Sequence, residues 1–272
     1  AFWNSELELS VILKDTEEMV AQFAAMSAAA VTKFGAPEAL STGSDPLQAV
    51  WRTRTGRPGR ALVFIHGGYW RRFCAADYAF VANLAHHADA TFYNVDYRLM
   101  PDVRMAETVA DAVNGVTLAL AEVDEAVLVG HSAGAHLAIE AALRAPKPPQ
   151  AVVPISGLFE LAPLRAAFLQ DELTFTPAEI RSFSPQMRVA DMPCPVSLMV
   201  GDDETTEFKR QSARLYDGLM EAGRPASLSF VKGRHHNEIV ADLSDPATAA
   251  SRAVLSLMTQ TPTLDAGQTS PA

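Results

Sequence analysis

The stretch that decides the fold is residues 125–140, Glu-Ala-Val-Leu-Val-Gly-His-Ser-Ala-Gly-Ala-His-Leu-Ala-Ile-Glu. Its first part is a short apolar run rich in valine, which is typical of a buried strand. Strong helix formers follow from Ala133 to Arg144, so we expect a helix there. Between the two lies Gly130-His-Ser-Ala-Gly134, which fits the pattern G-x-S-x-G. The sequence therefore places Ser132 on a sharp turn between a strand and a helix.

Ser132 is the candidate nucleophile because of the geometry that such a turn imposes. Glycines at both ends let the strand and the helix approach closely, and the serine hydroxyl is left exposed on the bend. The positive end of the helix dipole points at the same place, where an oxyanion would develop during attack on a carbonyl group. The N–H of Ala133 is a natural donor to that oxyanion. The alternative, a tight turn with an inert serine, depends on whether the chain also supplies a base and an acid.

The bulk composition describes an ordinary globular protein that is able to bury a large core. The chain has 272 residues, of which 49% are hydrophobic and 20% are charged. Its net charge is −10, and no cluster of lysine and arginine stands out. Phosphate backbones and anionic membrane surfaces repel such a chain, so we expect neither nucleic acid nor a membrane as a partner.

The sequence lacks the common targeting and cofactor signals. No apolar run approaches the roughly 18 to 20 residues of a membrane span, and the acidic N-terminus is unlike a signal peptide. Cys74 and Cys194 lie far apart, which favours two reduced thiols over a disulfide or a metal site. The glycine motifs do not fit G-x-G-x-x-G, and no H-E-x-x-H or phosphate-binding loop occurs. We therefore expect a cytoplasmic protein without a metal or another cofactor.

Strand-like and helix-like segments alternate through most of the chain. Besides the pair around Ser132, we expect strands at 49–55, 61–66, 91–97, 151–157, 196–200 and 226–231, and helices at about 20–31, 75–88, 105–122, 207–222 and 247–258. The segment Arg57-Pro-Gly-Arg60 is typical of a turn. This alternation predicts one doubly wound, mostly parallel sheet with helices on both faces, in a single domain over residues 1–260.

Two segments are not needed for the sheet, and we expect them to cap the site. Residues 1–45 contain a helical arm, and residues 158–191 are an insertion without a clean hydrophobic period. Residues 261–272 are polar and contain proline and glycine, which predicts a flexible tail. With Tyr69 and Trp70, the aromatic side chains of the insertion predict a mostly apolar roof; they are Phe159, Phe168, Phe175 and Phe183.

A serine hydroxyl needs a base to become a good nucleophile, and that base needs an acid to orient it. Behind a G-x-S-x-G serine, the acid and then the histidine follow in the chain, each on a loop after a strand. His235 and His236 come directly after the last expected strand, and counting from Gly233 favours His236 as the base. His235 is then a neighbouring loop residue.

The candidates for the acid follow the strand at 196–200. Asp202, Asp203 and Glu204 are adjacent there, and they cannot all orient one imidazole ring. The acid commonly stands two or three residues after the glycine that ends this strand, which leaves Asp203 and Glu204. Because glutamate reaches one methylene further than aspartate, the residue types alone do not decide between them.

A second informative turn is His66-Gly67-Gly68-Tyr69-Trp70. Glycines directly after a buried strand free backbone N–H groups to face a ligand, as in the HGGG-type loop of esterases. We expect Gly67 and Gly68, with Tyr69 as a further option, to donate to the oxyanion together with Ala133. His66 is a brace for this loop rather than a second base. Tyr69 and Trp70 either pack in the core or form a wall of the substrate pocket.

Five short segments carry a resemblance to a known family: His66–Trp70, Asp96–Pro101, Gly130–Gly134, Gly157–Pro163 and Glu207–Ser212. They resemble the α/β-hydrolases of the kynurenine formamidase (arylformamidase) type, a group that borders on the hormone-sensitive-lipase-like esterases. The resemblance extends from about Trp51 to Leu257 and implies an α/β-hydrolase fold with a small cap. Carried over by motif, it implies Glu204 as the acid and His236 as the base.

One departure from this family bears on the substrate. Its members often carry Asp-Lys shortly after HGGYW, where this chain has Cys74-Ala75. We therefore expect a serine esterase or amidase that cleaves a small carboxylic ester or an N-formyl or aryl amide through an acyl-serine intermediate. Kynurenine formamidase proper and a non-catalytic binding protein of the hydrolase fold are the alternatives. The expected partner is a small-molecule substrate, and the sequence leaves room for a homodimer.

Overall fold

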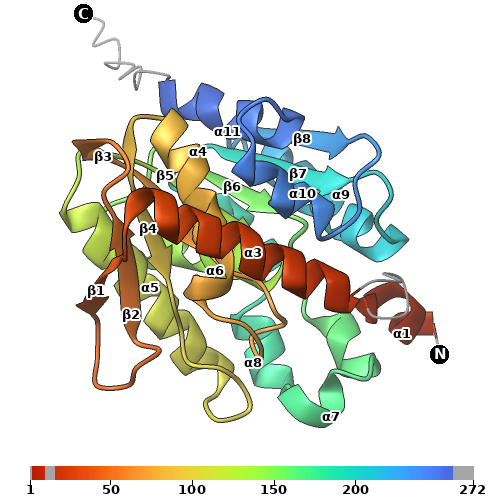
Figure 1. Ribbon diagram of the computed structural model, residues 1–272. Coiled ribbons are helices and arrows are strands. Elements are labelled where there is room, and N and C mark those ends of the chain that lie inside the picture. Colours follow the sequence, from red (N-terminus) through yellow and green to blue (C-terminus); the bar gives the residue numbers. More distant parts are fainter. Residues whose placement is uncertain (1, 10–15, 260–272) are drawn as a thin grey trace, which may run out of the picture.

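The computed structural model describes residues 2–9 and 16–259. An eight-stranded sheet runs through it in the order β1-β2-β4-β3-β5-β6-β7-β8 (Figure 1). The expected tail at 261–272 and residues 10–15 of the arm lie outside the described residues. The strands are β1 (Glu38–Ser41), β2 (Ala49–Thr53), β3 (Arg57–Ile65), β4 (Ala90–Val95), β5 (Glu125–His131), β6 (Ala151–Ile155), β7 (Val196–Gly201) and β8 (Ala226–Val231).

Most of this sheet is parallel, as the alternation of strands and helices predicts. Neighbouring strands from β4 through β3, β5, β6 and β7 to β8 pair in parallel, whereas β2 runs antiparallel to both β1 and β4. Parallel strands covered on both faces read as continuous apolar runs, and β4 and β6 are buried along their whole length. The predicted doubly wound, mostly parallel sheet is therefore confirmed.

Helices cover both faces of the sheet (Figure 1), and the sheet separates the hydrophobic core into two layers. Met105, Leu137 and Phe208 bring α5, α6 and α9 into one layer, and Phe23 and Val254 bring α3 and α11 into the other. No helix within the described ranges is long and apolar enough to cross a bilayer. The longer helices are α3 (Thr16–Phe34), α5 (Met105–Ala121), α6 (Ala133–Arg144), α9 (Thr206–Glu221) and α11 (Ala249–Thr259), and the shorter ones are α1 (Phe2–Leu7), α4 (Ala82–His87), α7 (Gln170–Leu173), α8 (Pro177–Ser182) and α10 (Glu238–Ala241).

The N-terminal helix α1 joins the insertion to the start of α9. Leu7 is fully buried, and the backbone N–H of Phe168 in the insertion donates to the side-chain oxygen of Asn4 at 2.8 Å. The carboxylate of Glu6 accepts a hydrogen bond of 2.8 Å from the N–H of Glu207. This N–H lies in the first turn of α9, where a negative charge is favourable. The described part of the arm is thus anchored at both sides of the site.

Three local expectations were wrong, each because tertiary contacts override a weak local pattern. The edge strand β1 was not expected, since its exposed residues show no apolar alternation; pairing of Glu38 with Arg52 fixes it. Residues 57–60 belong to β3 rather than to a separate turn, with a register shift and a positive φ of 86° at Gly59. The helix expected at 75–88 is split into a 3₁₀ helix, η1 (Ala75–Val81), and α4, with a kink at Tyr78.

Candidate active site

Ser132 stands on the predicted sharp turn between β5 and α6. Its φ of 56° and ψ of −121° are strained for a residue with a side chain. The turn needs both of its glycines: a Cβ on Gly130 would lie 2.2 Å from the carbonyl oxygen of Gly134, and one on Gly134 would lie 2.1 Å from that of Ile65. The N–H of Ser132 donates to Ile155 on β6 at 2.8 Å, which secures the turn against the neighbouring strand.

His236 and Glu204 form a buried hydrogen-bonded pair. The Nδ1 of His236 lies 2.7 Å from Oε2 of Glu204. Because a carboxylate only accepts, Nδ1 carries a proton, and in the neutral ring Nε2 then keeps its lone pair. Nε2 has no hydrogen-bond partner among the described residues. The other oxygen of Glu204 accepts from the N–H of Gly201 at 2.9 Å and from the hydroxyl of Ser156, so the carboxylate is fixed in place.

The alternatives that the sequence left open lie elsewhere. Asp203 is exposed, and among the described residues its backbone N–H donates to the carbonyl of Arg234 while its carboxylate has no partner. The Nε2 of His235 lies 3.5 Å from the carboxylate of Glu238, at the surface. Of the four candidates, the structure therefore brings together Glu204 and His236.

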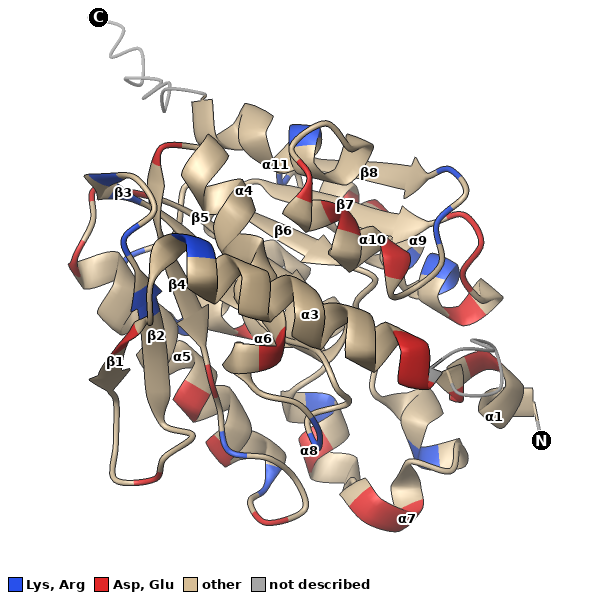
Figure 2. Cartoon of the chain, viewed as in Figure 1, with Lys and Arg blue, Asp and Glu red and all other residues tan. Residues whose placement is uncertain are grey.

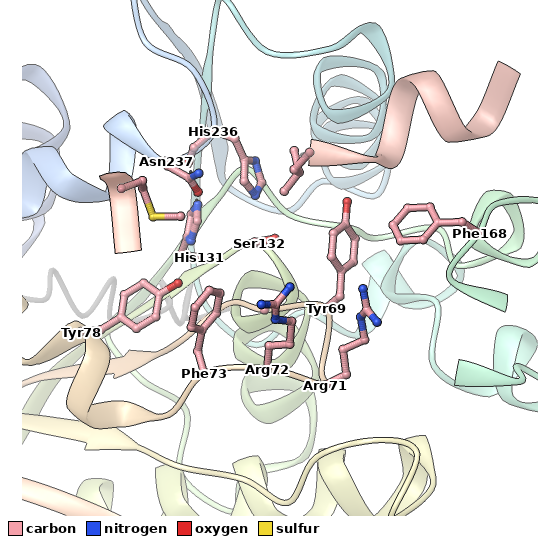
Figure 3. Close-up of a pocket in the computed structure, with 13 residues that line it drawn as sticks. Tyr69, Arg71, Arg72, Phe73, Tyr78, His131, Ser132, Phe168, His236 and Asn237 are labelled. Carbon is pink, nitrogen blue, oxygen red and sulfur yellow. Dashed lines mark hydrogen bonds between the residues drawn. The ribbon is translucent and has the colours of Figure 1, made fainter. Parts of the chain in front are cut away.

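Ser132 and His236 line one pocket of about 120 Å³ (Figure 3). The expected donors of the oxyanion lie beside it. A Cβ on Gly67 would come within 3.1 Å of the Cβ of Ser132, so this backbone passes directly over the serine. Within the described residues, neither Gly67 nor Gly68 donates its N–H to another backbone carbonyl, and Ala133 is the first residue of α6. Amides in such positions are available to a ligand.

Comparison with known proteins identifies the family of the fold. A family model described as alpha/beta hydrolase fold matches residues 62–240, which is more than half of the chain. The chain belongs to this family.

Individual relatives narrow the group further. Kynurenine formamidase of Danio rerio is 26% identical over 212 residues, which cover 72% of each chain. The solved structure of a candidate thioesterase from Silicibacter sp. superposes with a TM-score of 0.86 at 25% identity, over 93% of this chain and 98% of its own. A hormone-sensitive lipase from a metagenome library has a TM-score of 0.66 at 19% identity, over 92% and 97%, and thus shares the fold. These similarities confirm the predicted resemblance to the kynurenine formamidase and hormone-sensitive-lipase-like group.

The two aromatic residues of the HGGYW loop divide between pocket and core. Tyr69 lines the pocket of the hydrolase, and its hydroxyl donates to the carbonyl of Leu7. Trp70 is fully buried; its indole N–H donates to Nδ1 of His136 at 3.3 Å, and its ring packs edge-on against Phe175. Of the two alternatives left open for this pair, Trp70 packs in the core and Tyr69 forms part of the pocket wall.

The roof of the pocket is also less aromatic than expected. Phe168 lines it, but Phe159 and Phe175 are buried in the core and Phe183 packs at the edge of that core. The expectation was wrong for these three because an insertion without a clean period does not show which aromatic side chains turn inward. Leu9 of the arm and Met19 of α3 complete the apolar part of the wall.

His66 contacts the HGGYW loop rather than the pocket. Its ring stacks on Tyr97 at 4.3 Å between centroids, and its Nδ1 lies 2.8 Å from the carbonyl of Gly67. Its Nε2 lies 3.5 Å from Asp96, a buried carboxylate that also accepts from the N–H of Ala75 at 2.6 Å. These contacts fit the expected role of a brace.

His131, the residue before the serine, supports the loop that carries His236. Its Nε2 donates to the backbone carbonyl of His236 at 2.9 Å, and the two rings lie 4.8 Å apart. Burial, together with the positive charge that His236 can carry, holds the pKa of His131 well below its usual range. His131 therefore stays neutral and cannot compete with His236 as a proton carrier.

Sequence reasoning missed two positively charged residues of the pocket, Arg71 and Arg72. The available signal was their position directly after HGGYW in the chain. The thiols offer no second nucleophile, because burial raises the pKa of Cys74 and raises that of Cys194 to about 12. Within residues 2–9 and 16–259, no group of three or more histidine, cysteine, aspartate or glutamate side chains is placed to hold a metal ion.

Proposed function

We propose that the protein is a serine hydrolase that cleaves a small ester or activated amide through an acyl-serine intermediate. The observation that carries the proposal is the state of His236. Its Nδ1 is held by Glu204, its Nε2 is unpartnered within the described residues, and it shares a pocket with Ser132. An imidazole in this state is prepared to accept a proton from a serine hydroxyl.

The chemistry follows from these positions. The Oγ of Ser132 attacks the substrate carbonyl carbon while its proton passes to Nε2 of His236. The negative charge on the former carbonyl oxygen is stabilised by the N–H groups of Gly67, Gly68 and Ala133. His236 then gives the proton to the leaving alcohol or amine, and the acyl group stays on Ser132. Water, deprotonated by the same nitrogen, releases the acid and restores the serine.

The size of the pocket favours a short acyl group. A volume of about 120 Å³ next to Ser132 accommodates formyl or acetyl groups better than long acyl chains. Formyl amides of aromatic amines are a specific candidate, since the relatives include kynurenine formamidases. N-formylkynurenine is accordingly one substrate to test, although Cys74-Ala75 departs from the pattern of that family.

The test compares wild type with Ser132→Ala on p-nitrophenyl acetate and N-formylkynurenine. We expect turnover by wild type and its loss in the variant, with circular dichroism unchanged. p-Nitrophenyl esters of increasing chain length should be cleaved with falling kcat/KM. Equal rates in wild type and Ser132→Ala would refute the nucleophile, and a preference for chains of eight carbons or more would refute the small pocket. If no ester or amide is cleaved, the alternative of a non-catalytic binding protein gains support.

A further inference from the structure

The pocket of Ser132 is lined by two arginine side chains. Arg71 and Arg72 both line it, and no carboxylate does so among the described lining residues. Arg71 forms an ion pair with Glu172 and lies 5.9 Å from the ring centre of Phe168. Arg72 is exposed and has neither an ion pair nor a side-chain hydrogen bond within the described residues. One guanidinium group is thus free to bind a ligand.

This guanidinium is directed at the reacting end of the pocket. In Figure 3 the side chain of Arg72 extends between Phe73 and Tyr69 on the side of Ser132, whereas that of Arg71 turns toward Phe168. The guanidinium carbon of Arg72 lies 5.9 Å from the centre of the Phe73 ring, within the range of a cation–π contact.

The backbone holds Arg72 in this position. The N–H groups of Arg71 and Arg72 both donate to the carbonyl of Gly68 at 3.1 Å. Gly68 has a φ of 114°, and a Cβ there would lie 2.2 Å from the carbonyl oxygen of Arg72. The same tight turn therefore presents the amides of the loop to the oxyanion and Arg72 to the substrate.

Arg72 differs from other arginines without an ion pair among the described residues, such as Arg224, in that it lines the pocket of Ser132. The chain as a whole carries a net charge of −10, and Figure 2 shows acidic residues spread over most elements. Glu17 and Glu18 lie in the first turn of α3, but neither forms an ion pair with Arg72. Glu204 is occupied by His236. An unpaired arginine in a partly enclosed, largely apolar pocket attracts an anion, and its planar fork matches a carboxylate.

We propose that Arg72 binds a carboxylate of the substrate, so that the enzyme prefers esters or amides that carry a carboxylate away from the scissile bond. This inference rests on the proposed hydrolase function and names its substrate class. Two N–H groups of Arg72 would donate to the two carboxylate oxygens, and the bound group would orient the substrate carbonyl at Ser132. A neutral substrate of the same shape lacks this contact.

Two matched substrate pairs test the proposal. In the first pair, p-nitrophenyl hemisuccinate carries a carboxylate on its acyl group and p-nitrophenyl butyrate is its neutral counterpart. In the second pair, 3-acetoxybenzoate carries a carboxylate on the leaving group and its methyl ester is the neutral counterpart. We expect wild type to prefer the charged member of at least one pair, and Arg72→Gln to lower the ratio of the two kcat/KM values about ten-fold or more. Arg72→Lys should retain part of the preference, and raising the salt concentration should reduce it.

The matched control is Arg224→Gln. Arg224 is exposed in the turn before β8 and has no side-chain partner within the described residues, so its substitution changes the net charge equally. It should leave the ratio unchanged. The proposal would be overturned if the ratio of the two kcat/KM values were the same in wild type and Arg72→Gln, or if it fell equally in Arg72→Gln and Arg224→Gln. Either result would leave the hydrolase function intact.

A binding measurement separates the two proposals. Calorimetric titration of benzoate into Ser132→Ala needs no turnover, and we expect binding that weakens about ten-fold when Arg72→Gln is added. If no ester is cleaved but benzoate binds through Arg72, the proposed function fails and the anion site stands. If esters are cleaved but benzoate binding does not depend on Arg72, the anion site fails.

Discussion

The hydroxyl of Tyr69 donates a hydrogen bond of 2.5 Å to the backbone carbonyl of Leu7. The donor belongs to the loop that presents the amides of Gly67 and Gly68 to Ser132, and the acceptor ends α1. Burial raises the pKa of Tyr69, so its hydroxyl stays protonated and remains a donor. The N-terminal arm is thereby attached to the part of the site where an oxyanion would form.

Removing this hydroxyl should loosen the arm. In Tyr69→Phe the carbonyl of Leu7 loses a buried partner, which costs about 1 kcal/mol. Opening of α1 then becomes about five-fold more frequent, and hydrogen exchange of the amides of residues 2–9 should accelerate by that factor. Since Leu9 lines the pocket, we also expect a lower kcat/KM. Tyr216→Phe is the control, because its hydroxyl has no hydrogen bond within the described residues; equal exchange in both variants would contradict the proposed attachment.

The acid of the site can be identified by two substitutions that remove the same charge. Glu204→Gln takes the carboxylate from Nδ1 of His236 and lets the ring adopt the wrong tautomer or orientation, so kcat should fall by orders of magnitude. Asp203→Asn, one residue earlier and exposed, should change kcat by less than about two-fold. Turnover of p-nitrophenyl acetate by the two variants decides the matter, and the reverse ranking would show that Asp203 is the acid.

The site residues that could be predicted from the sequence are those that follow the ends of strands. Ser132, Glu204 and His236 each follow a strand of the parallel part of the sheet, and parallel strands bring their carboxyl ends to one edge of the sheet. The pattern of strands in the sequence therefore predicts that these three side chains lie at the same edge of the sheet. The choice of Glu204 over Asp203 came from the family resemblance, because residue types alone do not show which carboxylate turns inward.

The elements that could not be predicted depend on side-chain direction and on distant pairing. Tyr69 and Trp70 are neighbours with φ values of 52° and 58°, yet one faces the pocket and the other the core. Such a reversal in a strained loop has no periodic signal. Arg72 was overlooked because charge was judged by clusters along the chain, whereas its importance comes from the absence of a partner. Strand β1 is held by its pairing with β2 and has little propensity of its own.

The buried histidines should make the protein unstable in mild acid. Burial lowers the pKa of His136 from its ordinary 6.5 to about 4, and it lowers the pKa of His131 in the same direction. Between these two values the unfolded chain binds a proton that the folded chain does not, so the free energy of unfolding falls as the pH falls. His136 contributes about 1.4 kcal/mol per pH unit in this range, which is about 2 kcal/mol between pH 6.5 and pH 5.

Urea unfolding of His136→Gln at pH 7 and pH 5 tests whether His136 causes part of this loss of stability in acid. His136 donates from Nε2 to the carbonyl of Phe183 at 2.7 Å, and an amide N–H of glutamine can make the same bond without titrating. We expect the variant to be less stable than wild type at pH 7, because the contact with Trp70 is altered, but to lose about 2 kcal/mol less on going to pH 5. His87→Gln, at an exposed histidine of α4, should keep the pH dependence of wild type. If His136→Gln keeps it too, the acid sensitivity arises from other groups.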